Sequence, residues 1–110
     1  MIADGGAYGC STEGVMRKAA ILGAGPYQID NLQMDTVGVY TNNTPSGAFR
    51  SFGALQTEFA TESILDICAE KLKMDPFELR RKNMFVAGDL THTKQELNSA
   101  SIGTVLNELE

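Results

Sequence analysis

The sequence has few of the residues that build disulfide frameworks and metal centres, with two cysteines and one histidine among 110 residues. Cys10 and Cys68 are too few for a disulfide framework, and no Cys-x-x-Cys pair offers the ligand spacing of a zinc or iron–sulfur site. His92 lies in a polar stretch without a second ligand near it in sequence, so we assign it no metal. Both cysteines are expected to be free thiols in a reducing compartment, with the cytoplasm as the expected location.

Long apolar segments and a surplus of basic residues are also missing. No stretch is apolar over the length of a bilayer, and the first residues contain Asp4 and no basic segment, so neither a membrane span nor a signal or transit peptide is expected. Nine lysines and arginines are scattered among fourteen acidic residues, and this balance argues against a nucleic-acid-binding face. What remains is a chain of one-domain size with 43% hydrophobic residues, enough for a modest core.

The first forty residues predict strand, helix and strand in turn. Residues 2–9 are rich in small side chains and favour a short, weak strand. A helix should open at Ser11 or Thr12 and end at the next glycine-rich stretch. Alternation over 32–36, followed by an apolar run over 37–40, predicts a strand that passes from half-exposed to buried.

The second half predicts a helical pair. A helix with one wide apolar stripe should run from Ala54 to about Met74. Asp75 then provides an N-cap, Pro76 occupies the first helical position and Glu78 lies where it could bond back to the cap, so another helix should follow.

Residues 86–100 form a polar loop of a length that is unusual inside a self-contained domain, and we expect it to lie on a partner surface. Ser101 should cap a last helix whose apolar residues recur at helical spacing: Ile102, Val105, Leu106 and Leu109. The partner of this stripe is expected outside the chain, or in a second copy when the chain is isolated.

Several charged residues have ordinary structural interpretations. The basic cluster of Arg80, Arg81 and Lys82 falls late in a helix, where it should interact with the helix dipole and solvent, with a subunit contact as the alternative. Glu58 and Glu62 are interpreted as solvated or capping charges.

The most informative segment is the loop over residues 41–55, which leads from the second strand into the long helix. Its glycines could let a large ligand approach the backbone, Arg50 supplies a planar positive group, and Phe52 supplies a flat apolar face. Unpaired amides at the helix start favour an anionic group. The alternative is an ordinary loop in which Phe49 and Phe52 pack in a core and Arg50 is solvated.

Several motifs extend this pattern along nearly the whole chain, in the order Gly-Pro-Tyr27, Tyr40-Thr-Asn42, Gly47-Ala-Phe-Arg-Ser-Phe-Gly53, Gln56, Met74-Asp-Pro-Phe-Glu-Leu-Arg80 and Lys82-Asn83. In this order they resemble the large subunit of molybdenum hydroxylases, the xanthine dehydrogenase and aldehyde oxidase family. The resemblance implies an α+β, helix-rich internal fragment of a longer subunit. Within this partial molybdopterin-binding domain of residues 1–110, a strand–helix–strand leads to the cofactor loop (1–50), a helical pair follows (51–85), and a loop and C-terminal helix end it (86–110).

In the family, this loop lies beside a molybdenum ion held by a pterin dithiolene. The resemblance therefore implies cofactor contacts from six loop residues: Gly47, Ala48, Phe49, Arg50, Ser51 and Gly53. Phe52 matches the aromatic residue that stacks against a heteroaromatic substrate. Counting back from Tyr27 places Lys18 where xanthine enzymes have a substrate-contacting arginine, so Lys18 is a candidate substrate contact and xanthine itself is not favoured.

The reaction implied is hydroxylation of a heteroaromatic or aldehyde carbon with oxygen from water, with electrons passed to iron–sulfur clusters and FAD on other domains or subunits. The family's glutamate base belongs to a motif that nothing here matches. No catalytic or metal-ligating residue is therefore assigned, and the isolated chain is expected to be inactive without the remainder of the large subunit and its partner subunits.

Two departures from the family pattern occur in the loop. Ser51 stands where the commonest family loop has glycine, and Leu55 where it has proline. Carbon monoxide dehydrogenases carry a copper-holding cysteine in this loop, and since Ser51 cannot replace it that branch is disfavoured. A non-catalytic interaction module that docks by its last helix, and a truncated fragment that merely retains the fold, remain as alternatives.

Overall fold

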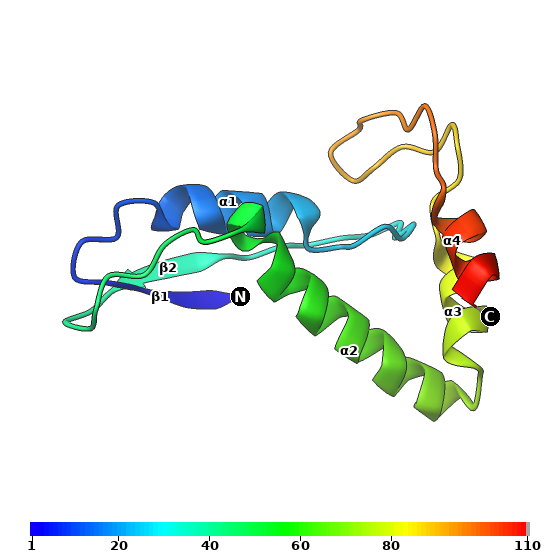
Figure 1. Ribbon diagram of the computed structural model, residues 1–110, viewed down its shortest axis with the longest axis horizontal. Coiled ribbons are helices and arrows are strands. Elements are labelled where there is room, and N and C mark those ends of the chain that lie inside the picture. Colours follow the sequence, from blue (N-terminus) through cyan, green and yellow to red (C-terminus); the bar gives the residue numbers. More distant parts are fainter. Residues whose placement is uncertain (110) are drawn as a thin grey trace. The chain divides into compact units, whose positions relative to one another are not determined.

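The computed structural model describes residues 1–109 and separates into two compact units, residues 1–24 with 33–61, and residues 25–32 with 62 onward. The elements follow in the order β1 (Ile2–Gly6), α1 (Thr12–Leu22), β2 (Val37–Tyr40), the 3-10 turn η1 (Ser51–Gly53), α2 (Ala54–Leu72), α3 (Pro76–Asn83) and α4 (Ile102–Leu109) (Figure 1). The expected helix-rich α+β class is confirmed.

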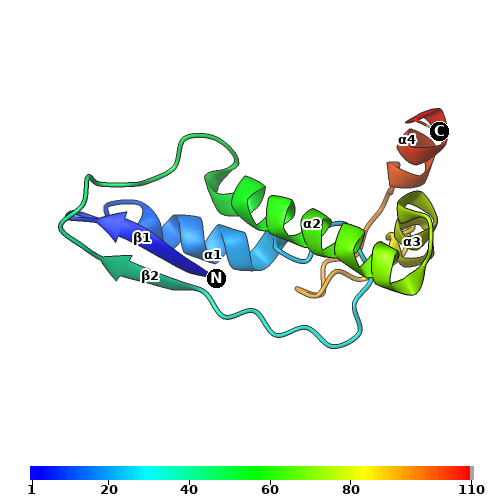
Figure 2. The ribbon, with the colours of Figure 1, turned by 90° about the horizontal axis from the view of Figure 1, so that it is seen from below.

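In the first unit, β1 and β2 pair in parallel and lie side by side, with the register shifted near the end of β1 (Figure 2). Parallel strands need a crossover connection, and α1 provides it. The helix packs on β2 at Gly38, where the side chains of Thr12 and Met16 occupy the space that a Cβ would take. Val15, Met16 and Ala19 form the buried face of α1.

β2 is shorter and more exposed than the sequence predicts. Residues 32–36 form no strand, and all four residues of Val37–Tyr40 are exposed. The prediction of a buried strand was wrong because an apolar run is typical of a parallel strand covered on both faces. The described residues give this sheet two strands, which leaves much of Val37, Val39 and Tyr40 uncovered.

The end of α1 is joined to the first half of α2 in the same unit. The hydroxyl of Thr61 donates a hydrogen bond of 2.6 Å to the carbonyl of Gly23. A Cβ on Gly23 would meet the methyl of Met34 and the side chain of Thr57, so glycine allows the close approach. These contacts fix the helix that begins directly after the candidate cofactor loop.

The second unit contains an ion-paired cluster that the sequence interpretation missed. Arg80 Nη2 lies 2.7 Å from Glu62 Oε2 and 2.9 Å from Asp66 Oδ1, and Tyr27 donates a hydrogen bond of 2.7 Å to Glu62 Oε1. The expectation of solvated charges was wrong for Arg80 and Glu62, because the chain fold brings residues far apart in sequence together. Burial alone would lower the pKa of Arg80, but the two carboxylates raise it; burial and then the bond to Glu62 raise the pKa of Tyr27.

The N-cap predicted for α3 is confirmed, since Asp75 Oδ1 accepts hydrogen bonds from the amides of Phe77 at 2.8 Å and Glu78 at 3.1 Å. Glu78 does not reach back to the cap as expected. Its carboxylate instead pairs with Lys82 one turn further along, at 2.8 Å.

The segment after α3 forms a turn closed by a bridge between Leu90 and Glu96, and then α4. Of the apolar stripe on α4, Leu106 is buried, whereas Val105 and Leu109 stay exposed. None of the helices within residues 1–109 has the length and apolar character needed to cross a membrane.

Candidate functional site

The first half of the 41–55 loop is anchored to the end of β1. The Asp4 carboxylate accepts hydrogen bonds from Thr41 Oγ1 at 2.6 Å, from Asn43 Nδ2 at 2.5 Å and from the Gly6 amide at 2.8 Å. These three donors lower the pKa of Asp4, in the order Thr41, Asn43 and Gly6. The carboxylate is therefore held in its charged form by the segment that leads into the loop.

Ser46 continues the anchoring. Its hydroxyl donates to the backbone carbonyl of Asp4 and its amide donates to the carbonyl of Gly5 at 3.2 Å. From the start of α1, Ser11 Oγ accepts from the Ala48 amide at 3.3 Å. The loop is thus tied to β1 and α1 as far as Ala48.

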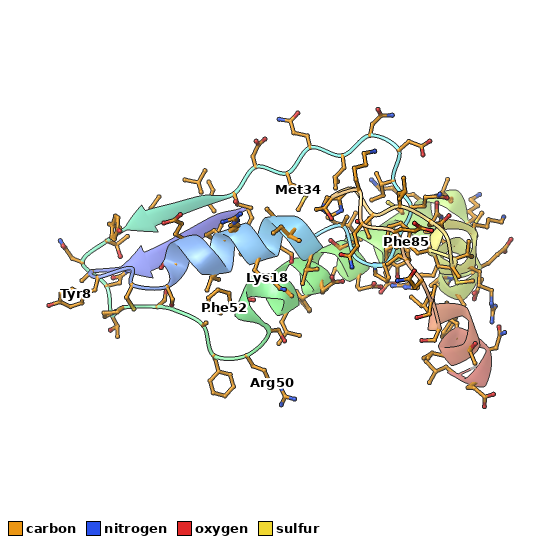
Figure 3. All side chains as sticks on the ribbon, turned by 90° about the horizontal axis from the view of Figure 1, so that it is seen from above. Tyr8, Lys18, Met34, Arg50, Phe52 and Phe85 are labelled. Atoms are coloured by element: carbon orange, nitrogen blue, oxygen red, sulfur yellow. The ribbon has the colours of Figure 1, made fainter. Side chains whose placement is uncertain are left out.

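Between these anchors and the next packed residue, the loop is open. Phe49 is fully exposed, and Arg50 forms no hydrogen bond or ion pair with any described residue. Across residues 1–109, the backbone amides of Gly47, Phe49 and Arg50 also find no acceptor. Figure 3 shows Arg50 pointing away from α1.

The loop closes through three consecutive residues with positive φ. Ser51 and Phe52 adopt φ of 64° and 52°, and Gly53 adopts 101°, which places two non-glycine residues in the left-handed region. Such strain persists only where surrounding contacts hold it. The ring of Phe52 rests against Gly14 of α1, and Gly53 lies against the carbonyl of Val15.

The structure brings the two candidate substrate contacts to one side of α1. Gly14, on which Phe52 packs, and Lys18 are four residues apart and therefore neighbours on one helix face. Figure 3 shows Phe52 turned toward α1, with Lys18 on that helix. Phe52 is still 42% exposed, so part of its ring is free for a ligand.

The glycines of the loop serve the chain itself. A Cβ on Gly47 would come within 2.5 Å of Ser11 Oγ, and one on Gly53 within 2.3 Å of the Val15 carbonyl oxygen. The sequence had suggested ligand approach at these two positions. Their immediate role in the described residues is to let the loop lie close to α1.

The donor set of the loop fits a ligand rich in oxygen acceptors. Residues 41–55 contain no acidic side chain, and the amides of Gly47, Phe49 and Arg50 and the Arg50 guanidinium stand without acceptors among the described residues. Because unpaired donors gain from charged or oxo acceptors, this loop suits the phosphate, pterin or metal-oxo groups of a molybdenum cofactor.

A groove with a volume of about 860 Å³ lies elsewhere in the same unit. It is lined by the other side of α1, by β2 and by the turn before α1, with Tyr8, Cys10 and Arg17 among its residues. None of the candidate cofactor residues of the loop lines it.

The sequence analysis did not predict the anchoring role of Asp4. The only sequence signal for that role was the place of Asp4 in an Asp-Gly-Gly turn.

An α+β unit with a donor-rich, strained loop before a long helix defines a protein segment suited to bind a large anionic cofactor. Comparison with known proteins specifies the group, because residues 1–84 match the molybdopterin cofactor-binding domain. The chain belongs to this family, whose related proteins include xanthine dehydrogenases and aldehyde oxidoreductases.

Individual relatives support the assignment. The chain is 42% identical over 90 residues to a probable xanthine dehydrogenase subunit of Bacillus subtilis, a match that covers 82% of this chain and 12% of that protein. It is 43% identical over 94 residues to an aldehyde oxidoreductase of Megalodesulfovibrio gigas, covering 86% of this chain and 10% of the relative. The solved aldehyde oxidoreductase from Desulfovibrio gigas superimposes with a TM-score of 0.79 at 36% identity, over 98% of this chain and 13% of that one.

The nicotinate dehydrogenase large molybdopterin subunit of Eubacterium barkeri is 37% identical over 105 residues, covering 96% of this chain and 24% of the relative. The chain thus spans between about a tenth and a quarter of the length of these relatives.

Replacing Ser51 by glycine is expected to stabilise the chain. Its φ of 64° costs a side-chain-bearing residue about 1 kcal/mol, part of which glycine loses again through the entropy of the unfolded chain. The net gain should be about 0.5 kcal/mol in urea unfolding. Ser51→Ala, which keeps the Cβ, is the matched control, and an equal gain in that variant would contradict the explanation.

Proposed function

We propose that the chain forms part of the molybdenum-cofactor and substrate-binding region of a xanthine dehydrogenase-like oxidoreductase. The proposed reaction is hydroxylation of a heteroaromatic or aldehyde carbon with oxygen derived from water. The supporting observation is the 41–55 loop, anchored at both ends, with the Arg50 guanidinium and the amides of Gly47, Phe49 and Arg50 left without acceptors among the described residues. Family membership and the fold agree with this assignment.

In this proposal the loop residues hold the cofactor. The amides of Gly47, Phe49 and Arg50 donate hydrogen bonds, and the Arg50 guanidinium provides a positive charge and further donors. Ala48, Ser51 and Gly53 set the path of the backbone between these donors. When bound, the molybdenum cofactor supplies the two-electron redox chemistry, and this chain supplies its orientation.

Phe52 and Lys18 are the proposed substrate contacts. The exposed part of the Phe52 ring offers a flat face to a planar substrate and excludes water from that side. Lys18, on the same face of α1 as Gly14, offers a mobile positive charge to a carbonyl or carboxylate of the substrate.

The proposed enzyme is larger than this chain. We propose that residues 1–110 act together with the remainder of the large subunit, and with iron–sulfur and FAD domains or subunits that receive the electrons. Because no base is assigned here, the chain by itself should be inactive. The free thiols of Cys10 and Cys68 fit a reducing compartment such as the cytoplasm.

Arg50→Gln in the complete subunit tests the proposal. Loss of a charged hydrogen-bond donor to an anionic group should reduce tightly bound molybdenum by at least about tenfold. The measurement is metal mass spectrometry of the purified subunit after gel filtration. Arg17→Gln, an equal charge change on the groove side of α1, should retain the metal.

Equal molybdenum in both variants would refute the role of the loop. It would favour the alternative of an interaction module, to which the exposed Val105 and Leu109 side chains of α4 could contribute.

A further inference from the structure

Asp4 is a charged residue on β1 that the proposed function does not use. It follows Ala3 at the point where the register of β1 shifts, and its carboxylate accepts the Gly6 amide two residues on. This side-chain bond to the following backbone fixes a local turn. The turn presents both carboxylate oxygens, and the carbonyls of Asp4 and Gly5, to the loop.

The loop meets this turn at Thr41, Asn43 and Ser46. Thr41 and Asn43 donate to the carboxylate, and Ser46 donates to both carbonyls. A Cβ on Gly6 would lie 2.4 Å from the Thr44 carbonyl oxygen and 2.6 Å from Pro45 Cα, so the loop backbone lies directly on Gly6. The Asp-Gly-Gly turn is therefore shaped to receive residues 41–46.

The residues that need this support follow immediately. After Ala48, the loop has no anchoring hydrogen bond among the described residues until it packs on α1 at Phe52 and Gly53. The direction in which Arg50 leaves the loop is thus set by the Asp4 turn on one side and by α1 on the other. Asp4 is exposed and has no role in the hydrophobic core.

We propose that Asp4 is a positioning residue for the cofactor loop: its carboxylate fixes residues 41–46 so that Arg50 and the free amides are held ready for the cofactor. Asp4 touches neither cofactor nor substrate and acts through Thr41 and Asn43. The effect on cofactor binding rests on the proposed function, whereas the anchoring of the loop by Asp4 does not.

Substitutions at Asp4 separate the charge from the shape. Asp4→Asn keeps the size but removes the negative charge from the acceptor of all three donors, and one of the two acceptor oxygens becomes an amide nitrogen that cannot accept. Asp4→Glu keeps the carboxylate on a longer side chain and should restore part of the anchoring. Asp30→Asn makes the same charge change at an exposed residue outside the loop's unit.

Amide hydrogen exchange in the complete subunit measures directly how firmly the loop is anchored. In Asp4→Asn, the hydrogen-bonded loop amides of Thr41, Asn43, Ser46 and Ala48 should exchange at least about tenfold faster, since the charged acceptor that anchors the loop is lost. The thermal unfolding midpoint of Asp4→Asn should change little. The exchange rates of Asp4→Glu should lie between those of the wild type and Asp4→Asn, and the rates of Asp30→Asn should match the wild type. Unchanged exchange in Asp4→Asn overturns the proposal; so does a uniform increase over the whole chain, which would show general destabilisation.

Thr41→Val provides a second test if Asp4→Asn does not fold. It removes the hydroxyl that donates to Asp4 and accepts from the Asn43 amide, and it leaves Asp4 intact. Exchange of the Thr41, Ser46 and Ala48 amides should rise by a smaller factor than in Asp4→Asn. Exchange that stays at the wild-type rate in Thr41→Val contradicts the anchoring.

The content of bound molybdenum and the electron paramagnetic resonance spectrum of the metal measure the effect of the anchoring on the cofactor. Asp4→Asn should lower the molybdenum content several-fold and broaden the spectrum of the metal that remains, with partial recovery in Asp4→Glu. Faster loop exchange with wild-type molybdenum and spectrum overturns the positioning role. If Arg50→Gln also keeps its molybdenum, the proposed function fails as well. If Arg50→Gln loses molybdenum and Asp4→Asn does not, only the positioning role fails and the proposed function remains supported.

Discussion

Replacing Gly53 by alanine is expected to lower the free energy of unfolding by at least about 3 kcal/mol. The glycine adopts a φ of 101°, and a Cβ there would come within 2.3 Å of the Val15 carbonyl oxygen and 3.1 Å of its carbon. Neither obstacle can move easily, because the carbonyl belongs to the backbone of α1. The chain must therefore lift the loop from the helix or disturb α1, and urea unfolding followed by circular dichroism measures the loss.

Gly88→Ala is the matched control for this variant. Gly88 has a similar φ of 93°, but nothing lies within 4 Å of the position of its Cβ. This variant carries the backbone strain without the collision, so its loss should be only about 1–2 kcal/mol. Equal losses in the two variants would show that contact between Gly53 and α1 contributes nothing.

Arg80→Met is expected to lower the free energy of unfolding by about 2 kcal/mol. The Arg80 side chain is 14% exposed and its removal leaves the half-buried Glu62 without its cation and Asp66 without its partner. The value is below that of a fully buried pair because solvent reaches both carboxylates. Urea unfolding of the single variant measures the loss.

Two further variants test whether the lost ion pairs cause the destabilisation of Arg80→Met. Arg80→Met with Glu62→Gln should recover part of the stability, because the double variant leaves no half-buried charge unpaired and keeps an acceptor for the Tyr27 hydroxyl. Lys82→Met removes the exposed pair with Glu78 on the same helix and should cost less than about 0.5 kcal/mol. A loss in Lys82→Met as large as that in Arg80→Met would contradict a special role for the cluster.

Local sequence signals predicted those features that depend on neighbouring residues. The Asp75 cap and Pro76 start of α3 follow from rules that act over four residues, and the structure confirms both. The end of α2 was also expected near Met74, close to its observed end at Leu72. Each of these signals is contained in a short stretch of chain.

Features that depend on distant residues could not be predicted in this way. Arg80 and Glu62 are eighteen residues apart, and nothing in either local pattern indicates their ion pair. Similarly, the exposure of β2 follows from the number of strands beside it, and its composition contains no information about that number.

The candidate cofactor residues of the loop, together with Phe52 and Lys18, came mainly from the family resemblance. The residue types of this segment, taken alone, fitted an ordinary loop equally well. The structure adds the free donors around Arg50, the packing of Phe52 on α1 and the anchoring by Asp4. The packing of Phe52 and the anchoring by Asp4 are contacts across more than thirty residues of chain, which a short-range sequence pattern cannot reveal.

The two-stranded sheet also affects how the chain behaves in solution. One of its two strands, β2, combines exposed valine and tyrosine side chains with backbone groups that face no third strand among the described residues. An uncovered apolar edge of this kind is a template for intermolecular β-pairing and fibrillar aggregation. Mutual repulsion between negatively charged copies opposes that process, and it vanishes near the isoelectric point of about 4.8, so mildly alkaline buffers protect the chain during handling.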